Sequence, residues 1–339
     1  MTLVIHRRAF LLSLVAGAAS IRSSWSESEL QRITVALDWT PNTNHIGLYI
    51  ARDKGFYAEA GLNVEILPYG DTSSGTLISN RIADFGVTSA VGFFAQRAAG
   101  ADLKAIYAVV QTETGRLVFD AARSDIQSPK DLDGFTYGGF GSDWENALIS
   151  SIIRHDGGRG MFETVTLGTS AYEALANGAV DFTLEVSTWE GVKAELEGRE
   201  QRAFRYADYG VPDQHTTFIA SSEAYLADNP EMAAAFVRAT RRGYEYAVEH
   251  PDEAAEILIG ANQDILTVPA LIRASLEALV EGHYLRSADG VIGHIDPEKV
   301  EAIGGFFFEA GILRDADGAP LAERPDFTEY FTNRYLSGS

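Results

Sequence analysis

The chain has no cysteine and far fewer basic than acidic side chains. Without cysteine it can form no disulfide, no thiolate metal site and no cysteine nucleophile. Lys and Arg number 27 against 48 Asp and Glu, which gives a formal net charge of −21. This shortage of positive charge argues against nucleic-acid binding and against adhesion to anionic lipid. A cysteine-free composition fits an exported bacterial protein and is also compatible with the cytoplasm.

Motifs of common enzymes are absent as well. The sequence contains no G-x-S-x-G elbow, no G-x-x-x-x-G-K-[ST] loop and no H-E-x-x-H pair. We therefore expect no enzymatic activity, no cofactor and no metal site. The stretch 137–142, Y-G-G-F-G-S, runs from a predicted strand into a predicted helix but lacks dinucleotide-binding spacing. Close strand–helix packing and contact with a polar ligand both remain open for it.

The first 25 residues differ from the rest of the chain. Arg7 and Arg8 precede an almost unbroken apolar run over 9–19, and Ala16-Gly17-Ala18 has the small-x-small pattern of a cleavage site. This pattern predicts an export signal over 1–25. The paired arginines favour twin-arginine export over an ordinary Sec signal. Since the run is far short of the ~20 residues that span a bilayer, we expect a soluble periplasmic protein.

Beyond the signal, short β-branched or aromatic runs alternate with amphipathic segments. The length suggests about two domains, and 46% apolar residues can bury sizeable cores. Strands over 33–39 and 63–69 flank a predicted helix over 45–60, and the alternation predicts parallel-type sheets with helices on both faces. Segments 77–85 and 174–182 resemble each other, and both end in Asp-Phe. One such echo is explained by two similar α/β lobes.

Tryptophan follows one predicted strand in each half. Trp39 stands with Asn42 and Asn44 after the first strand, and Trp189 follows the strand that contains Glu185. Polar residues at the carboxyl ends of such strands are where open α/β folds bind ligands. Each segment by itself also fits a capped turn with a core tryptophan. Together they suggest a cleft that holds a planar heteroaromatic molecule, with a carboxylate to accept from ring amino groups.

The segment 36–49, A-L-D-W-T-P-N-T-N-H-I-G-L-Y, resembles the signature of the thiamine-biosynthesis-like solute-binding family. Segments 54–57, 83–87 and 188–191 also match, and the resemblance covers most of 33–260. That family includes ABC-importer receptors for a formylated aminopyrimidine, riboflavin-binding relatives and eukaryotic pyrimidine synthases. The resemblance implies an α/β type II periplasmic-binding-protein fold, in which two lobes are joined by a two-segment hinge. We expect lobe 1 over 31–121 and 222–339, and lobe 2 over 122–221.

The resemblance places Trp39, Asn42, Asn44 and Trp189 near the ligand, and strand-end positions add five further candidates. The nine predicted ligand-binding residues are Trp39, Asn42, Asn44, Tyr69, Ser89, Tyr137, Trp144, Glu185 and Trp189. Two departures from the family pattern stand out. Asn80-Arg81 replaces a turn that usually contains glycine, and the cysteine-rich motif of the synthases is missing.

These observations predict an extracytoplasmic solute-binding protein of an ABC importer that takes a planar heteroaromatic vitamin or precursor. A thiamine-type aminopyrimidine is the first choice of ligand. Riboflavin or another solute on the same fold is the alternative, and a pyrimidine-processing enzyme is a weaker one because the cysteine-rich motif is absent. The expected partners are this small ligand and an ABC permease in the inner membrane, with no nucleic acid and with the protein as a monomer.

Overall fold

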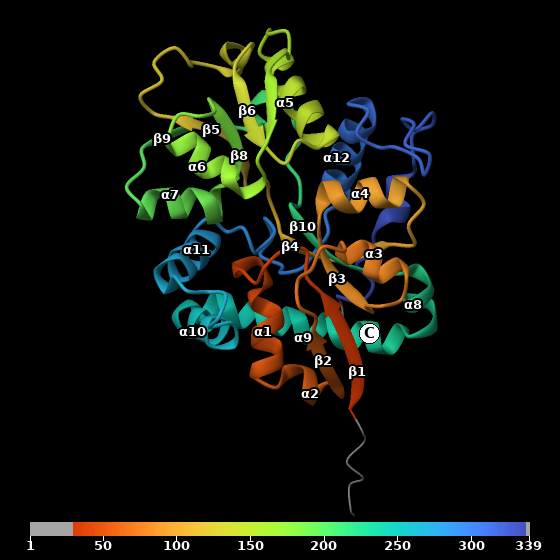
Figure 1. The fold of residues 1–339 in the computed structure, drawn as a ribbon. Coiled ribbons are helices and arrows are strands. Elements are labelled where there is room, and N and C mark those ends of the chain that lie inside the picture. Colours follow the sequence, from red (N-terminus) through yellow and green to blue (C-terminus); the bar gives the residue numbers. More distant parts are fainter. Residues whose placement is uncertain (1–29, 337–339) are drawn as a thin grey trace, which may run out of the picture.

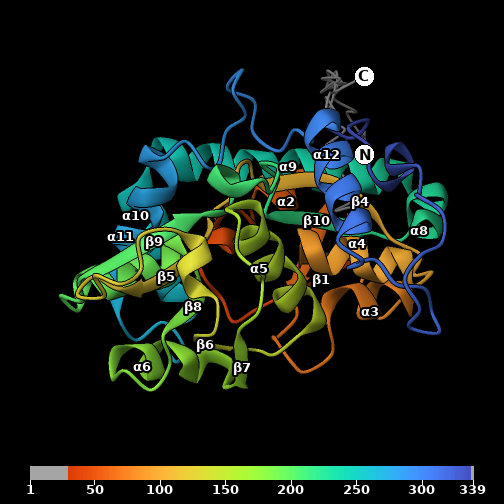
Figure 2. The same ribbon diagram turned by 90° about the horizontal axis from the view of Figure 1, so that it is seen from above.

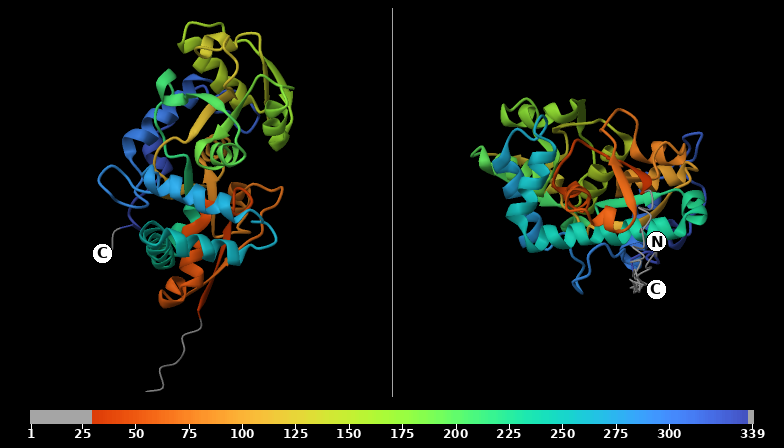
Figure 3. Two further views of the ribbon diagram at one scale, coloured as in Figure 1. Left: turned by 90° about the vertical axis from the view of Figure 1, so that its left-hand side faces the viewer. Right: turned by 90° about the horizontal axis from the view of Figure 1, so that it is seen from below.

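The computed structural model describes residues 30–336, which build two five-stranded sheets in opposite halves of an elongated molecule (Figures 1 and 3). The expected export signal over 1–25 lies outside the described residues. Within 30–336, no helix is both long enough and apolar enough to cross a bilayer.

The first sheet contains three parallel strands followed by two further strands that alternate in direction. Its strands, in spatial order, are β2 (Leu62–Ile66), β1 (Gln31–Ala36), β3 (Phe85–Ser89), β10 (Thr217–Ser221) and β4 (Lys104–Val110). β1 is parallel to β2 and β3, whereas β10 runs antiparallel between β3 and β4. The strands are largely buried, as expected for a sheet covered on both faces.

The second sheet repeats this arrangement in the upper half of Figure 1. Its strands, in spatial order, are β7 (Glu163–Thr166), β6 (Thr136–Gly139), β8 (Phe182–Val186), β5 (Gly115–Asp120) and β9 (Gln201–Arg205). β6 is parallel to β7 and β8, and β5 runs antiparallel between β8 and β9. The sheets are therefore mixed, and the expectation of parallel-type sheets holds only for three strands of each.

Helices cover both sheets. Those of the first half are α1 (Ile46–Asp53), α2 (Phe56–Glu59), α3 (Ser74–Ser79), α4 (Ala90–Ala98), α8 (Glu223–Asp228), α9 (Pro230–Glu249), α10 (Pro251–Ala261), α11 (Pro269–Glu281) and α12 (Pro297–Glu309). Those of the second half are α5 (Asp143–His155), α6 (Ala171–Ala176) and α7 (Val192–Leu196). Short 3-10 turns are η1 (Thr43–His45), η2 (Pro129–Leu132), η3 (Gly168–Ser170), η5 (Tyr206–Tyr209) and η6 (Phe327–Tyr330), and η4 (Ser187–Gly191) is a π-helical turn.

The chain passes twice between the sheets, and both passages differ from the expected boundaries. β5 follows β4 directly and belongs to the second sheet, although 31–121 was assigned to lobe 1. β10 belongs to the first sheet, although 122–221 was assigned to lobe 2. Sheet membership thus places the crossings at 111–114 and 206–216. A βαβ alternation does not show these points, because each crossing joins two strands without an α-helix at the change of sheet.

The echo between 77–85 and 174–182 corresponds to the same local structure in both halves. Oδ2 of Asp84 accepts from the backbone N–H of Thr34 at 2.8 Å, and Oδ2 of Asp181 accepts from that of Thr136 at 2.8 Å. Both turns need a left-handed residue, which is Gly178 with a φ of 74° and Arg81 with a φ of 57°. Arg81 thus occupies a conformation that suits glycine.

The two halves share a hydrophobic core. One buried cluster joins Phe94 and Phe218 of the first half to Phe119 and Phe182 of the second. Within the first half, α12 lies beside α4 in this cluster, and the ring centroids of Phe307 and Phe94 are 5.6 Å apart (Figure 2). On the other side α11 packs against η4 and α7 of the second half. The halves are therefore in contact on both sides of the crossings.

Candidate ligand-binding site

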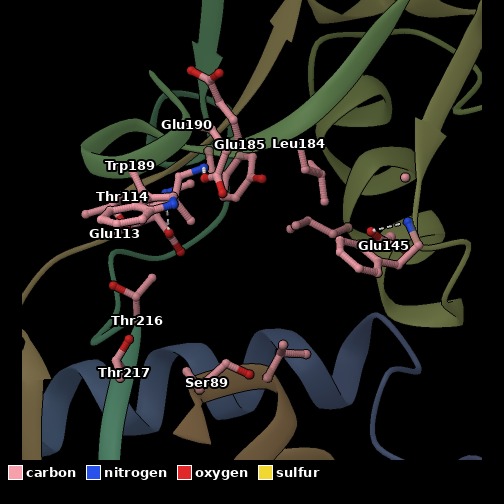
Figure 4. A pocket seen from close by; sticks show the side chains of 18 of the residues that line it. Ser89, Glu113, Thr114, Glu145, Leu184, Glu185, Trp189, Glu190, Thr216 and Thr217 are labelled. Carbon is pink, nitrogen blue, oxygen red and sulfur yellow. Dashed lines mark hydrogen bonds between the residues drawn. The ribbon is translucent and has the colours of Figure 1, made fainter. Parts of the chain in front are cut away.

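A cleft of about 390 Å³ lies between the two halves, where the crossings pass (Figure 4). Its lining includes eight of the nine predicted residues, namely Trp39, Asn42, Asn44, Ser89, Tyr137, Trp144, Glu185 and Trp189. The ninth, Tyr69, is not part of the lining. The ring centroids of Tyr69 and Trp39 are 5.5 Å apart. Tyr69 is 40% exposed, so it supports Trp39 from outside the cleft.

The loop after β1 is held together by its own polar side chains. Oδ1 of Asn42 accepts from the backbone N–H of Asn44 at 2.9 Å, and its Nδ2 donates to the carbonyl of Thr40 at 3.0 Å. Nδ1 of the buried His45 accepts from the backbone N–H of Asn42, so its Nε2 carries the proton that it donates to Asp38 at 2.8 Å. Asn42 therefore caps η1, a role that Asn residues commonly take.

Asn44 differs from Asn42 in this respect. Its carbonyl accepts from the hydroxyl of Tyr244 at 2.6 Å, while its side-chain amide has no hydrogen-bond partner among residues 30–336. The amide is half-buried at the cleft wall. It can donate to and accept from a ligand without breaking a bond of the fold.

A buried ion pair stands at one end of the cleft. Nε of Arg116 donates to Oε1 of Glu185 at 2.5 Å, and Glu185 is only 3% exposed. Burial raises the pKa of the Glu185 carboxyl, and Arg116 acts in the opposite direction. The pair packs tightly on the backbone, because a Cβ at Gly191 would lie 2.6 Å from Nη2 of Arg116. The guanidinium is thus already engaged by a carboxylate of the site.

Two more carboxylates lie beside this pair, and sequence reasoning did not select either. Burial raises the pKa of Glu190 to about 7, while its carboxylate accepts from the backbone N–H of Val186 at 3.1 Å. Burial also raises the pKa of Glu113, which accepts from the N–H of Gly115 at 2.6 Å and from the side-chain amide of Gln214. Figure 4 shows Glu113, Glu185 and Glu190 gathered around the indole of Trp189.

The bond between Glu113 and Gln214 joins the two crossings, since one residue lies on each. No local pattern marks these residues, because crossing segments carry no regular periodicity. Glu190 could have been selected, since it directly follows Trp189 at a strand end. Within the described part of the chain, no three His, Asp or Glu side chains are arranged to hold a metal ion.

The other end of the cleft contains polar groups that the fold already uses. Glu145 accepts from the hydroxyl of Tyr137 at 2.8 Å and from the N–H of Phe140 at 3.1 Å. Its second oxygen accepts from the N–H and the hydroxyl of Ser142, at 2.8 and 2.9 Å, in the capping box of α5. Ser89 caps α4 by accepting from the N–H of Gly92 at 3.2 Å. Tyr137 therefore lines the cleft with its hydroxyl proton already donated to Glu145, whereas Ser89 uses its hydroxyl oxygen only as an acceptor.

Aromatic rings meet across the mouth of the cleft. The ring centroids of Trp39, in the first half, and Phe140, in the second half, are 6.0 Å apart, and the two ring planes are inclined at 81°. Such an edge-on arrangement is favourable for aromatic pairs. This contact and the packing of Trp189 against the core of the first half both connect the two sides of the cleft.

Two α/β halves joined by two crossings around such a cleft define the periplasmic-binding-protein fold, and solved structures share it. The periplasmic aliphatic sulphonate binding protein SsuA from Escherichia coli has a TM-score of 0.66 at 16% identity, over 88% of this chain and 91% of that one. The alkanesulfonate-binding protein SsuA from Xanthomonas axonopodis pv. citri has a TM-score of 0.64 at 15% identity, over 87% and 97%. The expected fold class is confirmed.

The chain belongs to the family described as NMT1/THI5 like, which matches residues 42–254. The formylaminopyrimidine-binding protein of Halalkalibacterium halodurans is 30% identical over 304 residues, 87% of this chain and 90% of that protein. The riboflavin-binding protein RibY of Chloroflexus aurantiacus is 26% identical over 322 residues, 92% and 88%. A 4-amino-5-hydroxymethyl-2-methylpyrimidine phosphate synthase of Legionella pneumophila is 27% identical over 243 residues, 70% and 75%. The predicted family is confirmed.

Proposed function

We propose that this protein is an extracytoplasmic receptor that binds a thiamine-type aminopyrimidine in the cleft and, as a monomer, delivers it to an ABC permease in the inner membrane. The observation that carries the proposal is the end of the cleft where Trp189 stands beside Glu113, Glu185 and Glu190. An indole stacks on a flat ring, and carboxylates accept from the amino groups that an aminopyrimidine carries. Asn44 adds an unengaged amide.

The charge of this end disfavours anionic ligands. Three carboxylates face one guanidinium, and Arg116 is already paired with Glu185. A sulfonate or phosphate would find no unpaired guanidinium there and would be repelled by those of the three carboxyls that are ionised. The sulfonate alternative, suggested by relatives that share only the fold, is therefore weaker than a ligand that donates hydrogen bonds.

Riboflavin is the second candidate, because RibY covers most of the chain and a cleft of about 390 Å³ can hold more than one ring. For either ligand the mechanism is the same. The open cleft admits the ring, the halves close about the crossings, and the ligand is buried between them. The Glu113–Gln214 bond keeps the crossings together while the halves move.

Titration calorimetry of the mature protein tests the proposal with formylaminopyrimidine, riboflavin and an alkanesulfonate. We expect formylaminopyrimidine to bind at micromolar concentration or below and the sulfonate not to bind. Trp189→Ala should weaken binding at least about tenfold, because it removes the stacking surface and part of the buried area. Leu196→Ala, an exposed position on α7 outside the cleft, is the matched control. Absence of binding to every heteroaromatic compound would refute the proposal.

A further inference from the structure

The cleft has a second, apolar end that a single pyrimidine ring does not use. Its walls come from α4, α5, β8 and the α12 region, and they are Val91, Trp144, Leu148, Leu184, Phe307 and Ile312. In Figure 4, Leu184 points into the space between the carboxylate group around Trp189 and Glu145. The apolar end is thus continuous with the polar end within one cleft.

These walls are fixed parts of the core. Phe307 is 3%, Leu148 6% and Ile312 7% exposed, and all three belong to the buried cluster that joins both halves. Val91, Trp144 and Leu184 are partly exposed and pack against the same cluster. Because the core behind them is packed, the walls cannot collapse to fill the space themselves.

Polar ligand groups would find few partners at this end. The nearest carboxylate, Glu145, already accepts from four donors, and the hydroxyl of Tyr137 is one of them. Phe307 and Ile312 lie beyond residues 42–254, so this wall is supplied by a segment outside the family match. A lone aminopyrimidine at the polar end would leave these apolar walls in contact with water, which is unfavourable.

The geometry points to a ligand with two parts: a heteroaromatic ring with amino or N–H donors at the polar end, and an apolar substituent or fused ring that fills the apolar end. This inference rests on the proposed function and specifies its substrate class. The cleft volume of about 390 Å³ is in the range of sites for ligands larger than a single ring.

A pair of probes tests this inference. 4-Amino-2-methylpyrimidine occupies only the polar end, and its 5-benzyl derivative carries one further apolar ring. We expect the benzyl derivative to bind at least about tenfold more tightly, because it buries additional apolar surface. Val91→Phe, which fills the apolar end, should abolish this advantage, so that the two probes bind this variant with affinities within about twofold of each other.

The matched control is Val165→Phe, which places the same ring at an exposed position of β7 outside the cleft. It should preserve the tenfold advantage. Equal affinity of both probes for the wild type, or an equal loss of both in Val91→Phe, would overturn the two-part ligand and leave the receptor proposal intact. Failure of both probes and of formylaminopyrimidine to bind the wild type would instead refute the proposed function.

Discussion

At the scale of single residues, burial sets the charge of the polar end, and Glu190 gives a measurable consequence. Its pKa is raised from 4.5 to about 7 in the folded protein. The folded state therefore binds more protons than the unfolded state between these values, so stability falls as pH rises through this window. Below pH 4.5 the carboxyl is protonated in both states, so it no longer makes the unfolding free energy depend on pH.

Glu190→Gln should remove this dependence, because the amide stays neutral and its oxygen can still accept from Val186. In urea unfolding from pH 4.5 to 8, the variant should become increasingly more stable than the wild type as the pH rises to 7. The difference in unfolding free energy should reach about 3 kcal/mol at most and stay constant above pH 7. Carboxyls that do not interact with Glu190 contribute equally to both proteins and cancel in the comparison, whereas Glu185 lies close enough to interact with it. Parallel stability curves for the two proteins would contradict the assigned pKa.

Residue types in the sequence predicted which side chains face the cleft. They predicted less well which hydrogen-bond partner each of these side chains has. Glu185 and Tyr137 line the cleft as expected, yet Glu185 is paired with Arg116 and Tyr137 donates to Glu145. These partners lie 69 and 8 residues away in sequence, and no local pattern connects them. Glu113 was missed because its place in the cleft depends on Gln214, 101 residues further on.

At the scale of elements, the loop between β1 and α1 separates a folding role from a binding role within three residues. Asn42→Ala removes the cap of η1 and should cost about 1 kcal/mol of unfolding free energy. Asn44→Ala removes an amide without a described partner, so stability should change by less than about 0.5 kcal/mol.

Ligand binding should show the complementary pattern. We expect Asn44→Ala to weaken formylaminopyrimidine binding about tenfold, through loss of one hydrogen bond in a buried site. Thermal unfolding of the ligand-free variants and calorimetric titration measure the two effects separately. A loss of stability in Asn44→Ala as large as that in Asn42→Ala would show that Asn44 also serves the fold.

Most regular elements could be predicted from hydrophobic periodicity, whereas their interruptions could not. The helix expected over 45–60 is divided into α1 and α2, and α4 was not anticipated although Ser89 caps it. Arg81 stands where the family pattern usually has glycine, and its left-handed φ of 57° follows from the turn between α3 and β3. Tertiary contacts decide such positions more than local propensity does.

At the scale of the whole molecule, the presence of two lobes could be predicted from the sequence. The sheet to which β5 and β10 each belong could not. The repeated alternation and the echo between 77–85 and 174–182 indicate two similar units. The positions of β5 and β10 follow from antiparallel pairing between distant segments, which the sequence pattern does not encode. The placement of the cleft depends on these two strands, because the crossings that adjoin them line it.

The ring contact across the cleft mouth leads to a prediction about ligand release. Trp39 and Phe140 belong to opposite halves, and their ring centroids lie 6.0 Å apart, so in the proposed mechanism their contact stabilises the closed arrangement. Phe140 is 48% exposed, and Phe140→Ala should therefore leave the fold intact. An aromatic pair contributes about 0.5–1.5 kcal/mol, which corresponds to a dissociation rate about 2–10-fold faster.

Association should change little in Phe140→Ala, because the open cleft forms before the rings meet and affinity changes within one site mostly affect dissociation. Stopped-flow tryptophan fluorescence with formylaminopyrimidine measures both rates. Met161→Ala, which truncates a 61% exposed side chain of the second half outside the cleft, is the control and should leave both rates unchanged. If Phe140→Ala slowed association and left dissociation unchanged, the contact would guide entry of the ligand rather than hold the closed state, since a contact formed after binding acts on release alone.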